Sequence, residues 1–122
     1  MVGPMPTHLV QLVVDAADPA GLARFWAGAA AWPVAEAGDR LVALRHPSGG
    51  GPFLELVRSA TPKLVKNRLH LDVAPHPGDD PATEVARLLD LGATHADIGQ
   101  GKVTWTVLAD PEGNELCVLS PR

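Results

Sequence analysis

The chain is poor in cysteine and in basic residues. Its single cysteine, Cys117, cannot form an internal disulfide bond, so nothing in the sequence indicates an oxidising compartment. Ten Lys and Arg residues stand against fourteen Asp and Glu residues, and the formal net charge is -4. A nucleic-acid surface needs a basic face to neutralise phosphates, so we expect no nucleic-acid partner.

Long apolar runs are also missing. No stretch approaches the ~20 apolar residues that span a bilayer, and no basic, apolar and small-residue pattern of a signal peptide precedes the body of the chain. We expect no membrane partner and a cytoplasmic location. Glycine and proline, at twelve residues each, fall at the ends of periodic segments, so they indicate turns and element boundaries rather than disorder.

The length of 122 residues predicts one domain that buries roughly two thirds of its surface. Residues 1–7 hold two prolines and no periodicity, which predicts a flexible leader. Residues 8–122 are expected to form the domain, with one order of elements used twice. We divide them into module one at 8–59, a linker at 60–67 and module two at 68–122.

Module one begins with HLVQLVVD at 8–15, a β-branched and apolar run that is typical of a buried strand. Asp18 and Pro19 then supply a helix N-cap and a proline at the first helical position. The helix should end before Pro33. Its apolar stripe consists of Leu22, Phe25, Trp26 and Ala29. Three short strands are expected near 33–37, 40–46 and 53–59.

Module two repeats this order. RLHLDVA at 68–74 predicts a strand, Asp80-Pro81 predicts a second helix start, and Gly92 suits the end of that helix. The helix segments DPAGLARFW and DDPATEVARLL share letters, and with the matching order they favour an internal duplication. Strands are expected at 93–98, 103–109 and 115–120, with a turn at 110–113.

Basic residues gather where the two modules join. Four of the ten lie between positions 58 and 68, namely Arg58, Lys63, Lys66 and Arg68. One interpretation is a solvated linker. The other is a positively charged rim that attracts carboxylate or phosphate ligands to a neighbouring pocket. The sequence leaves both interpretations open.

A βαβββ unit used twice and closed by DPEGNELCVL resembles the vicinal oxygen chelate superfamily, which includes glyoxalase I, bleomycin-resistance proteins and extradiol dioxygenases. The strings DAADPAGLARFW, KNRLHLDV and VLADPEGNELCVL are most similar to small bacterial glyoxalase-like domains, and the resemblance extends from about residue 8 to residue 120. It implies an α+β fold in which two tandem βαβββ modules form a curled mixed sheet around a cavity, with the helices outside. A homodimer is a further expectation, because paired modules of this superfamily often dimerise.

The resemblance also implies a set of metal ligands. In metal-binding members, each module supplies one ligand from its first strand and one from its last, which places them here at Gln11, Glu55, His70 and Cys117. Catalytic members have glutamate at the position of Cys117. A thiolate favours softer ions such as Zn²⁺, and a neutral thiol is no substitute for a carboxylate base at pH 7. The resemblance thus implies an optional divalent metal (Zn, Ni, Mn or Fe) and argues against glyoxalase I activity.

Each of these four residues also has an ordinary structural interpretation. The amide of Gln11 could satisfy neighbouring backbone groups, and His70 could be a hydrogen-bonded core histidine. Glu55 alternates with apolar residues, so it needs a partner if it is buried and is a candidate pocket residue. Cys117 could be a small buried hydrophobe.

Three further residues are candidates for the wall of the pocket. Asp72 shares a strand face with His70, where it could bind a metal, orient the imidazole or be a charge at the wet end of the strand. Glu115 shares a face with Cys117 and could supply the missing carboxylate or lie in solvent. Trp105 is interpreted as a core residue, with the cavity wall as the alternative.

These observations favour a protein that binds a small organic molecule in the cupped sheet, as bleomycin-resistance proteins do, without a metal. The alternative is a metal-dependent lyase, isomerase or dioxygenase with a degenerate ligand set. A third possibility is a domain kept for structural or regulatory association. The expected substrate-binding residues are Glu55, His70, Asp72, Trp105 and Glu115.

Overall fold

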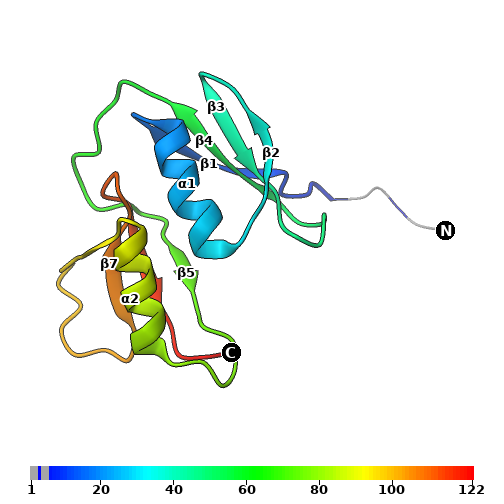
Figure 1. Ribbon diagram of the computed structural model, residues 1–122. Helices are drawn as coiled ribbons and strands as arrows, with labels where there is room; N and C mark the ends of the chain where they lie inside the picture. Colours follow the sequence, from blue (N-terminus) through cyan, green and yellow to red (C-terminus); the bar gives the residue numbers. More distant parts are fainter. Residues whose placement is uncertain (1–2, 4–5) are drawn as a thin grey trace.

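The computed structural model describes residue 3 and residues 6–122, and Figure 1 shows their arrangement. The flexible leader predicted at 1–7 therefore lies mostly outside the described residues. Module one occupies the upper part of the view and module two the lower part, with the two helices packed against each other.

The two modules have the same topology. Module one contains β1 (Gln11–Ala16), α1 (Pro19–Ala30), β2 (Val34–Ala37), β3 (Leu41–Leu44) and β4 (Phe53–Arg58). Module two contains β5 (Leu71–Val73), α2 (Pro81–Leu91), β6 (Thr94–His95), β7 (Thr106–Ala109) and β8 (Glu115–Val118). This order confirms the predicted α+β fold of two tandem βαβββ modules.

Each module forms its own four-stranded mixed sheet, and the two sheets stay open. The strand orders are β1-β4-β3-β2 and β5-β8-β7-β6. In both sheets the first strand pairs in parallel with the last, and the other pairs are antiparallel. β1 and β5 are therefore edge strands at equivalent positions in the duplication, and β2 and β6 form the opposite edges.

Both helices begin where the sequence predicts. The side chain of Asp18 accepts a hydrogen bond of 3.1 Å from the backbone N–H of Gly21 ahead of the Pro19 start. Asp80 caps α2 in the same way through Ala82, at 3.3 Å. The C-cap of α2 is Gly92 with φ of 121°, a conformation that favours glycine.

The helices cover one face of each sheet and enclose a single core with it. Its largest fully buried side chains include Leu22, Phe25, Leu56, Leu88, Leu108 and Leu116. Because strand side chains alternate, the neighbouring positions face the other, open side of each sheet. Val13 illustrates this open side, since it is 53% exposed between Leu12 and Val14, which pack against the core.

Hydrogen bonds also join the two modules at both ends of α1. The carboxylate of Glu112 accepts bonds of 2.6 and 2.9 Å from the backbone N–H groups of Ala17 and Asp18, just before α1 begins. At the other end, Arg87 of α2 donates bonds of 2.9 Å each to the carbonyl oxygens of Gly28 and Ala29. These contacts fix how the modules sit relative to each other.

Module two has shorter strands than the sequence suggests. The strand expected at 68–74 is confined to Leu71–Val73, so His70 lies just before it. The strand expected at 103–109 begins only at Thr106, after a turn region in which Gly99 and Gly101 have positive φ. These glycines interrupt the extended chain between β6 and β7. No helix within the described part of the chain has the length and apolar character needed to cross a membrane.

Candidate functional site

A cavity of about 920 Å³ lies between the two modules. One wall comes from β1 and the residues that follow it, and the opposite wall comes from residues 61–71, which lead into β5. Glu112, Asn114 and Glu115 close it from the side of β8. The volume is in the range of pockets that bind small molecules. The cavity thus forms between β1 of module one and the segment that leads into β5 of module two.

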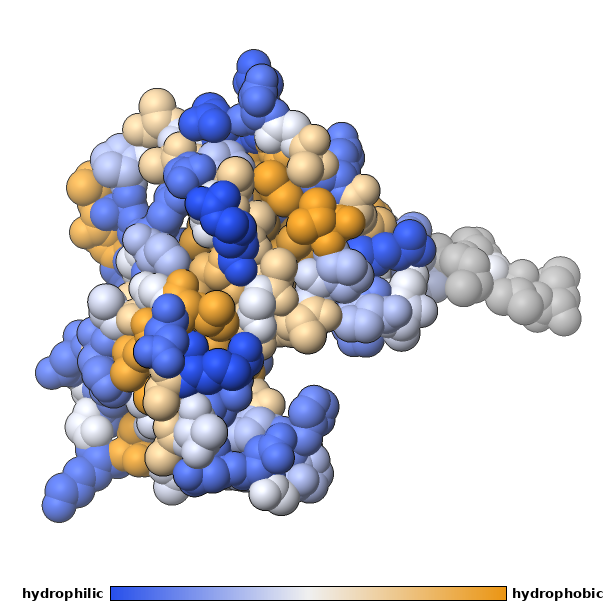
Figure 2. All heavy atoms as spheres, in the orientation of Figure 1, coloured by the Kyte–Doolittle hydropathy of each residue, from blue (hydrophilic) through white to orange (hydrophobic). Residues whose placement is uncertain are grey.

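The segment between β4 and β5, residues 59–70, forms much of this wall and is called the connector below. It carries exposed apolar side chains that belong to the cavity lining, since Leu64 is 84% and Val65 is 76% exposed. Figure 2 shows apolar surface at the left edge of the molecule, over this segment. The connector has no helix or strand of its own, so its path depends on side-chain contacts.

Glu115 holds the connector in place. Its carboxylate is 8% exposed, forms an ion pair of 2.9 Å with Lys63, and accepts a hydrogen bond of 3.0 Å from the backbone N–H of Asn67. The side chain of Asn67 donates a further bond of 3.0 Å to Asn114. The alternative of a solvated Glu115 is therefore wrong. The residue lines the cavity and anchors its wall.

The environment of Glu115 favours its ionised form. Burial alone would raise the pKa of the carboxyl. The hydrogen bonds from Lys63 and from the backbone N–H groups of Asn67 and Glu115 act in the opposite direction, together with the Lys63 charge, and the pKa is lowered overall. Glu115 therefore remains a carboxylate that accepts hydrogen bonds, which is the form that retains the connector.

His70 also faces the cavity, and its partner is a cation. The ammonium of Lys66 lies 3.1 Å from Nε2 of His70. An ammonium group can only donate, so Nε2 is the acceptor and the proton of the neutral ring is on Nδ1. His70 is exposed, which excludes the interpretation as a core histidine.

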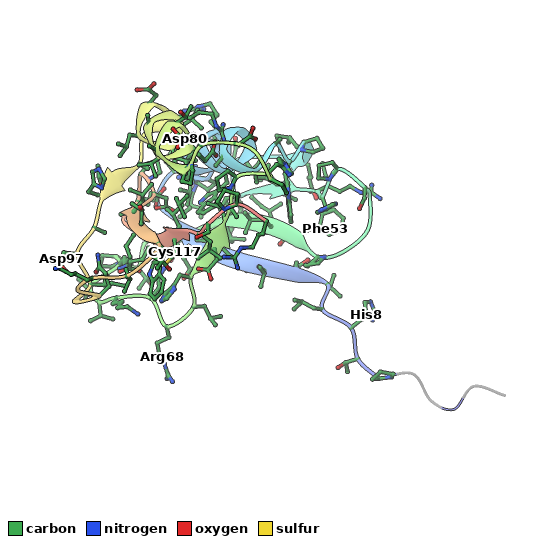
Figure 3. The ribbon with its side chains drawn as sticks, turned by 90° about the horizontal axis from the view of Figure 1, so that it is seen from below. His8, Phe53, Arg68, Asp80, Asp97 and Cys117 are labelled. Carbon is green, nitrogen blue, oxygen red and sulfur yellow. The ribbon has the colours of Figure 1, made fainter. Side chains whose placement is uncertain are left out.

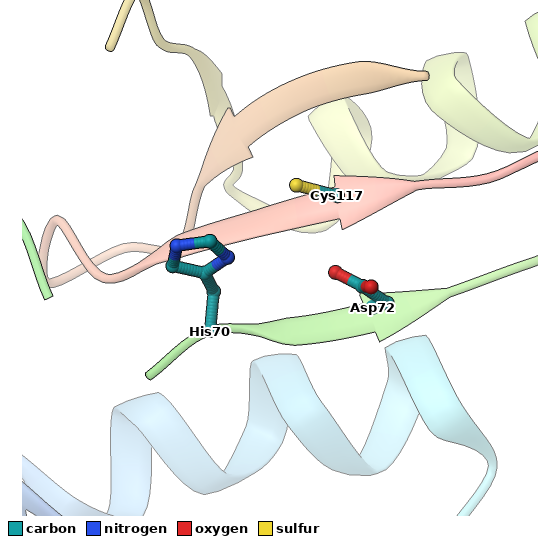
Figure 4. Close-up of side chains that lie close together, drawn as sticks. All are labelled: His70, Asp72 and Cys117. Carbon is teal, nitrogen blue, oxygen red and sulfur yellow. The ribbon is translucent and has the colours of Figure 1, made fainter. Parts of the chain in front are cut away.

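A second arrangement of polar side chains lies next to the cavity. One ligand atom from each of His70, Asp72 and Cys117 lies within 4.8 Å of the other two. Asp72 and Cys117 are direct partners in the register between β5 and β8. Figure 4 shows the three side chains on one side of these strands, with one ring nitrogen of His70 turned toward Asp72. We call these three residues the donor cluster.

Cys117 enters this donor cluster as a thiol. Burial raises the pKa of the thiol, the charge of the neighbouring Asp72 carboxylate and a hydrogen bond to it raise the pKa further, and Lys66 acts in the opposite direction. The side chain is 6% exposed, as its interpretation as a small buried residue predicts. Cys117 is therefore no replacement for the glutamate base that the resemblance implies for catalytic members at this position.

The four residues to which the resemblance assigns a metal do not meet at one point. Gln11 and His70 line the cavity, whereas Glu55 lies on the open face of β4, half-buried, opposite Val13 and Ala43. Among the described residues, the donor cluster is the one group of three or more His, Cys, Asp or Glu side chains whose ligand atoms come this close. Glu55 is outside it. The four-residue set therefore does not fit a single metal ion within one chain.

Trp105 is not a core residue. It precedes β7, is 40% exposed and lies outside the lining of the cavity. The prediction that Trp105 is a core residue was wrong, because the turn that contains Gly99 and Gly101 shortens β7, the strand that would have oriented this side chain. Trp26, in contrast, is 3% exposed and belongs to the core, as predicted.

The basic residues around the connector have separate roles. Arg58 donates to the backbone carbonyls of Ala17 and Asp39, each at 3.0 Å, and Lys63 forms the ion pair with Glu115. Figure 3 shows Arg68 pointing away from the body of the protein. Lys66 and Arg68 both line the cavity, and neither forms an ion pair with a carboxylate among the described residues. Three of the four basic residues therefore lie at the cavity, one of them paired with Glu115, while Arg58 lies outside its lining.

Asn67 and Asn114 were missed from the sequence, and Lys63 was noted only as one of the four basic residues, without its partner Glu115. Lys63 and Asn67 lie 52 and 48 positions from Glu115, and no local pattern connects them. Asn114 belongs to the turn string DPEGN, whose polar residues were interpreted only as a turn. A signal for Asn114 was its place beside Glu115, at the start of a strand that enters the site.

The family of glyoxalase-like domains matches the chain over residues 11–119. No curated protein sequence matches it. Among solved structures, the chain is similar to a glyoxalase/bleomycin resistance protein/dioxygenase family enzyme from Burkholderia phytofirmans PsJN, with a TM-score of 0.74 and 14% identity over 95% of this chain and 100% of that chain.

Two other solved structures have the same fold. The fosfomycin resistance protein FosX from Mesorhizobium loti gives a TM-score of 0.69 at 14% identity, covering 94% of this chain and 92% of its own. The oxidase ChaP-H2 gives 0.65 at 20% identity, covering 97% and 96%. At such identities these neighbours show the fold alone. The family match over most of the sequence shows that the chain belongs to the glyoxalase-like domain family.

Proposed function

We propose that this protein binds a small organic molecule in the cavity between its modules and has no glyoxalase I activity. The observation that carries this proposal is the cavity itself, which is large enough for such a ligand and is lined by residues from both modules. Apolar lining residues such as Leu12 and Leu54 would contact the body of the ligand. The polar groups of Gln11 and His70 would orient it.

The second part of the proposal is supported by the residue at position 117. In glyoxalase I chemistry a carboxylate takes a proton from carbon, and this chain has a thiol with a raised pKa at that position. Glu115 does not supply the missing base, because it is ion-paired to Lys63 and holds the connector. The solved neighbours, which include a fosfomycin resistance protein and an oxidase, share the fold but not one chemistry.

A ligand screen with a matched pair of variants tests the proposal. Val13 and Val34 are both strand residues of module one and are both 53% exposed, but only Val13 is among the lining residues of the cavity. Val13→Trp places an indole at the cavity wall, and Val34→Trp places one elsewhere on the surface. A panel of small aromatic and aliphatic acids, amides and antibiotics is screened by thermal shift, and hits are measured by calorimetry.

We expect compounds from this screen to bind the unmodified protein and the Val34→Trp variant with equal affinity. Their affinity for the Val13→Trp variant should be at least tenfold weaker. Hits that are insensitive to both substitutions would place the ligand outside the cavity and contradict the proposal. Conversion of the hemithioacetal of methylglyoxal and glutathione by the purified protein would contradict its second part.

A metal-dependent lyase, isomerase or dioxygenase is the second candidate function. The donor cluster of His70, Asp72 and Cys117 favours it, since imidazole, carboxylate and thiolate are the ligands that proteins offer to divalent ions. Turnover of a cavity ligand that appears only after a divalent ion is added would support this candidate over simple binding.

A further inference from the structure

The donor cluster differs from the ligand set that the superfamily implies. Its members come from β5, from the residue just before it and from β8, so all three belong to module two. Gln11 and Glu55, the two ligands expected from module one, come from the other sheet. Asp72 supplies the carboxylate in their place, because the register sets it directly opposite Cys117.

The types of ligand in the donor cluster favour one class of ion. A nitrogen, an oxygen and a sulfur form a mixed set of borderline and soft character, which suits Zn²⁺ better than ions that prefer six oxygen ligands. Three protein ligands leave the fourth tetrahedral position open to water or to another molecule.

We propose that module two alone binds a Zn²⁺ ion through His70, Asp72 and Cys117, with a fourth position open to solvent. The Cys117 thiol releases its proton to solvent as the zinc–sulfur bond forms. This ion site shares His70 with the cavity wall of the proposed function, whereas Asp72 and Cys117 are not among the lining residues of the cavity.

The distances allow this coordination after small rotations. Zinc bonds of about 2.0–2.3 Å at tetrahedral angles separate ligand atoms by roughly 3.3–3.8 Å. In the donor cluster these atoms lie within 4.8 Å of one another, so each pair must approach by about 1.5 Å at most. His70 and Asp72 are exposed and can turn once Lys66 has released His70, while the buried Cys117 provides the fixed point.

Lys66 competes with the ion. Its ammonium occupies Nε2 of His70 and places the ring proton on Nδ1, and it adds a positive charge close to the donor cluster. Zinc binding at Nδ1 would move the ring proton to Nε2, where Lys66 can no longer donate. The ion therefore has to displace Lys66, and removal of this lysine should strengthen binding.

A calorimetric titration of the whole chain, metal-free and reduced, with ZnCl₂ tests the proposal. The visible spectrum of the Co²⁺ form adds a second readout, because a cobalt–thiolate bond produces its own absorption. We expect one ion per chain and a thiolate band. His70→Ala, Asp72→Asn and Cys117→Ser should each weaken binding at least tenfold, and Cys117→Ser should also remove the band.

Two further variants separate this site from other arrangements. Glu55→Gln should bind Zn²⁺ as the unmodified protein does, and Lys66→Gln should bind it several-fold more tightly. If Glu55→Gln weakens binding as much as Asp72→Asn does, a module-one ligand takes part and the proposal is overturned.

Unchanged binding by His70→Ala and Asp72→Asn would also overturn the proposal, and because both residues are exposed, this result does not depend on the folding of the Cys117 variant. The zinc titration contains no organic ligand. The zinc proposal can therefore be overturned while the cavity proposal holds, and the cavity proposal can be overturned while the zinc proposal holds.

Discussion

The indole nitrogen of Trp26, in the first helix, donates a hydrogen bond of 3.0 Å to Oδ2 of Asp110, in the turn before the last strand. The two residues are 84 positions apart and come from different modules. Asp110 is 2% exposed, and its carboxylate also accepts from the backbone N–H groups of Glu112 and Asn114 and from the Asn114 side chain. One carboxylate thus shapes the turn and binds it to module one.

Asp110→Ala should lower the free energy of unfolding by about 2–3 kcal/mol, because it leaves the buried indole N–H and the turn N–H groups without an acceptor. Urea denaturation measures this loss. Asp97→Ala is the matched control, since Asp97 accepts a turn N–H from Gly99 at 2.8 Å but is exposed. Its loss should stay below about 1 kcal/mol. Equal losses in the two variants would show that the buried indole contact contributes nothing.

Stability should also fall in acid through Glu115. The pKa of this carboxyl is lowered in the folded protein, so the folded state favours the ionised form. Its contribution is present above the unfolded pKa of about 4.3 and is lost as the pH falls through the lowered folded value. Denaturation at a series of pH values should show a shallower acid loss in Glu115→Gln than in the unmodified protein.

Two variants test whether this loss of stability in acid arises from the ion pair between Glu115 and the connector. Lys63→Met removes the ion pair of 2.9 Å and should reduce the pH dependence in the same direction. Glu36→Gln changes an exposed carboxylate of β2 and should leave the acid profile as it is. An unchanged profile in both Glu115→Gln and Lys63→Met would contradict the role assigned to this pair.

The fold was predictable because its signals are local. Asp18-Pro19 and Asp80-Pro81 place an N-cap and a proline together, and both helices begin there. Gly92 ends α2 because its φ of 121° is costly for other residues. The repeated order then gives the topology, since the second module follows the pairing of the first.

The site was predictable only in part, because its contacts are not local. Alternation along a strand placed His70 and Asp72 on one face, but it did not identify Cys117 as the direct partner of Asp72, which depends on the register of β5 and β8. The partners of Glu115 depend on the path of the connector, which carries no periodic pattern. Lys63 could therefore not be recognised as its counter-ion.

Arg87 should stabilise the contact between the helices. Its guanidinium donates to two carbonyl oxygens at the C-terminus of α1, where the helix dipole favours a positive charge, and it pairs with Glu84 at 2.6 Å. Arg87→Ala should cost about 1 kcal/mol, a small value because the side chain is 44% exposed. Urea denaturation should show no comparable loss in Arg24→Ala, which removes an exposed arginine from α1.

Glu112 should affect both stability and ligand binding. Its carboxylate accepts hydrogen bonds from the backbone N–H groups of Ala17 and Asp18, and both Glu112 and Ala17 line the cavity. Glu112→Ala removes both bonds at the start of α1 and should cost about 1 kcal/mol in urea denaturation. Because the two modules then lose a fixed contact beside the cavity, the same variant should also bind a cavity ligand several-fold more weakly. Glu112→Gln keeps one acceptor oxygen and should show about half of each effect. If Glu112→Ala loses stability while its affinity for the ligand stays unchanged, the cavity does not depend on this contact between the modules.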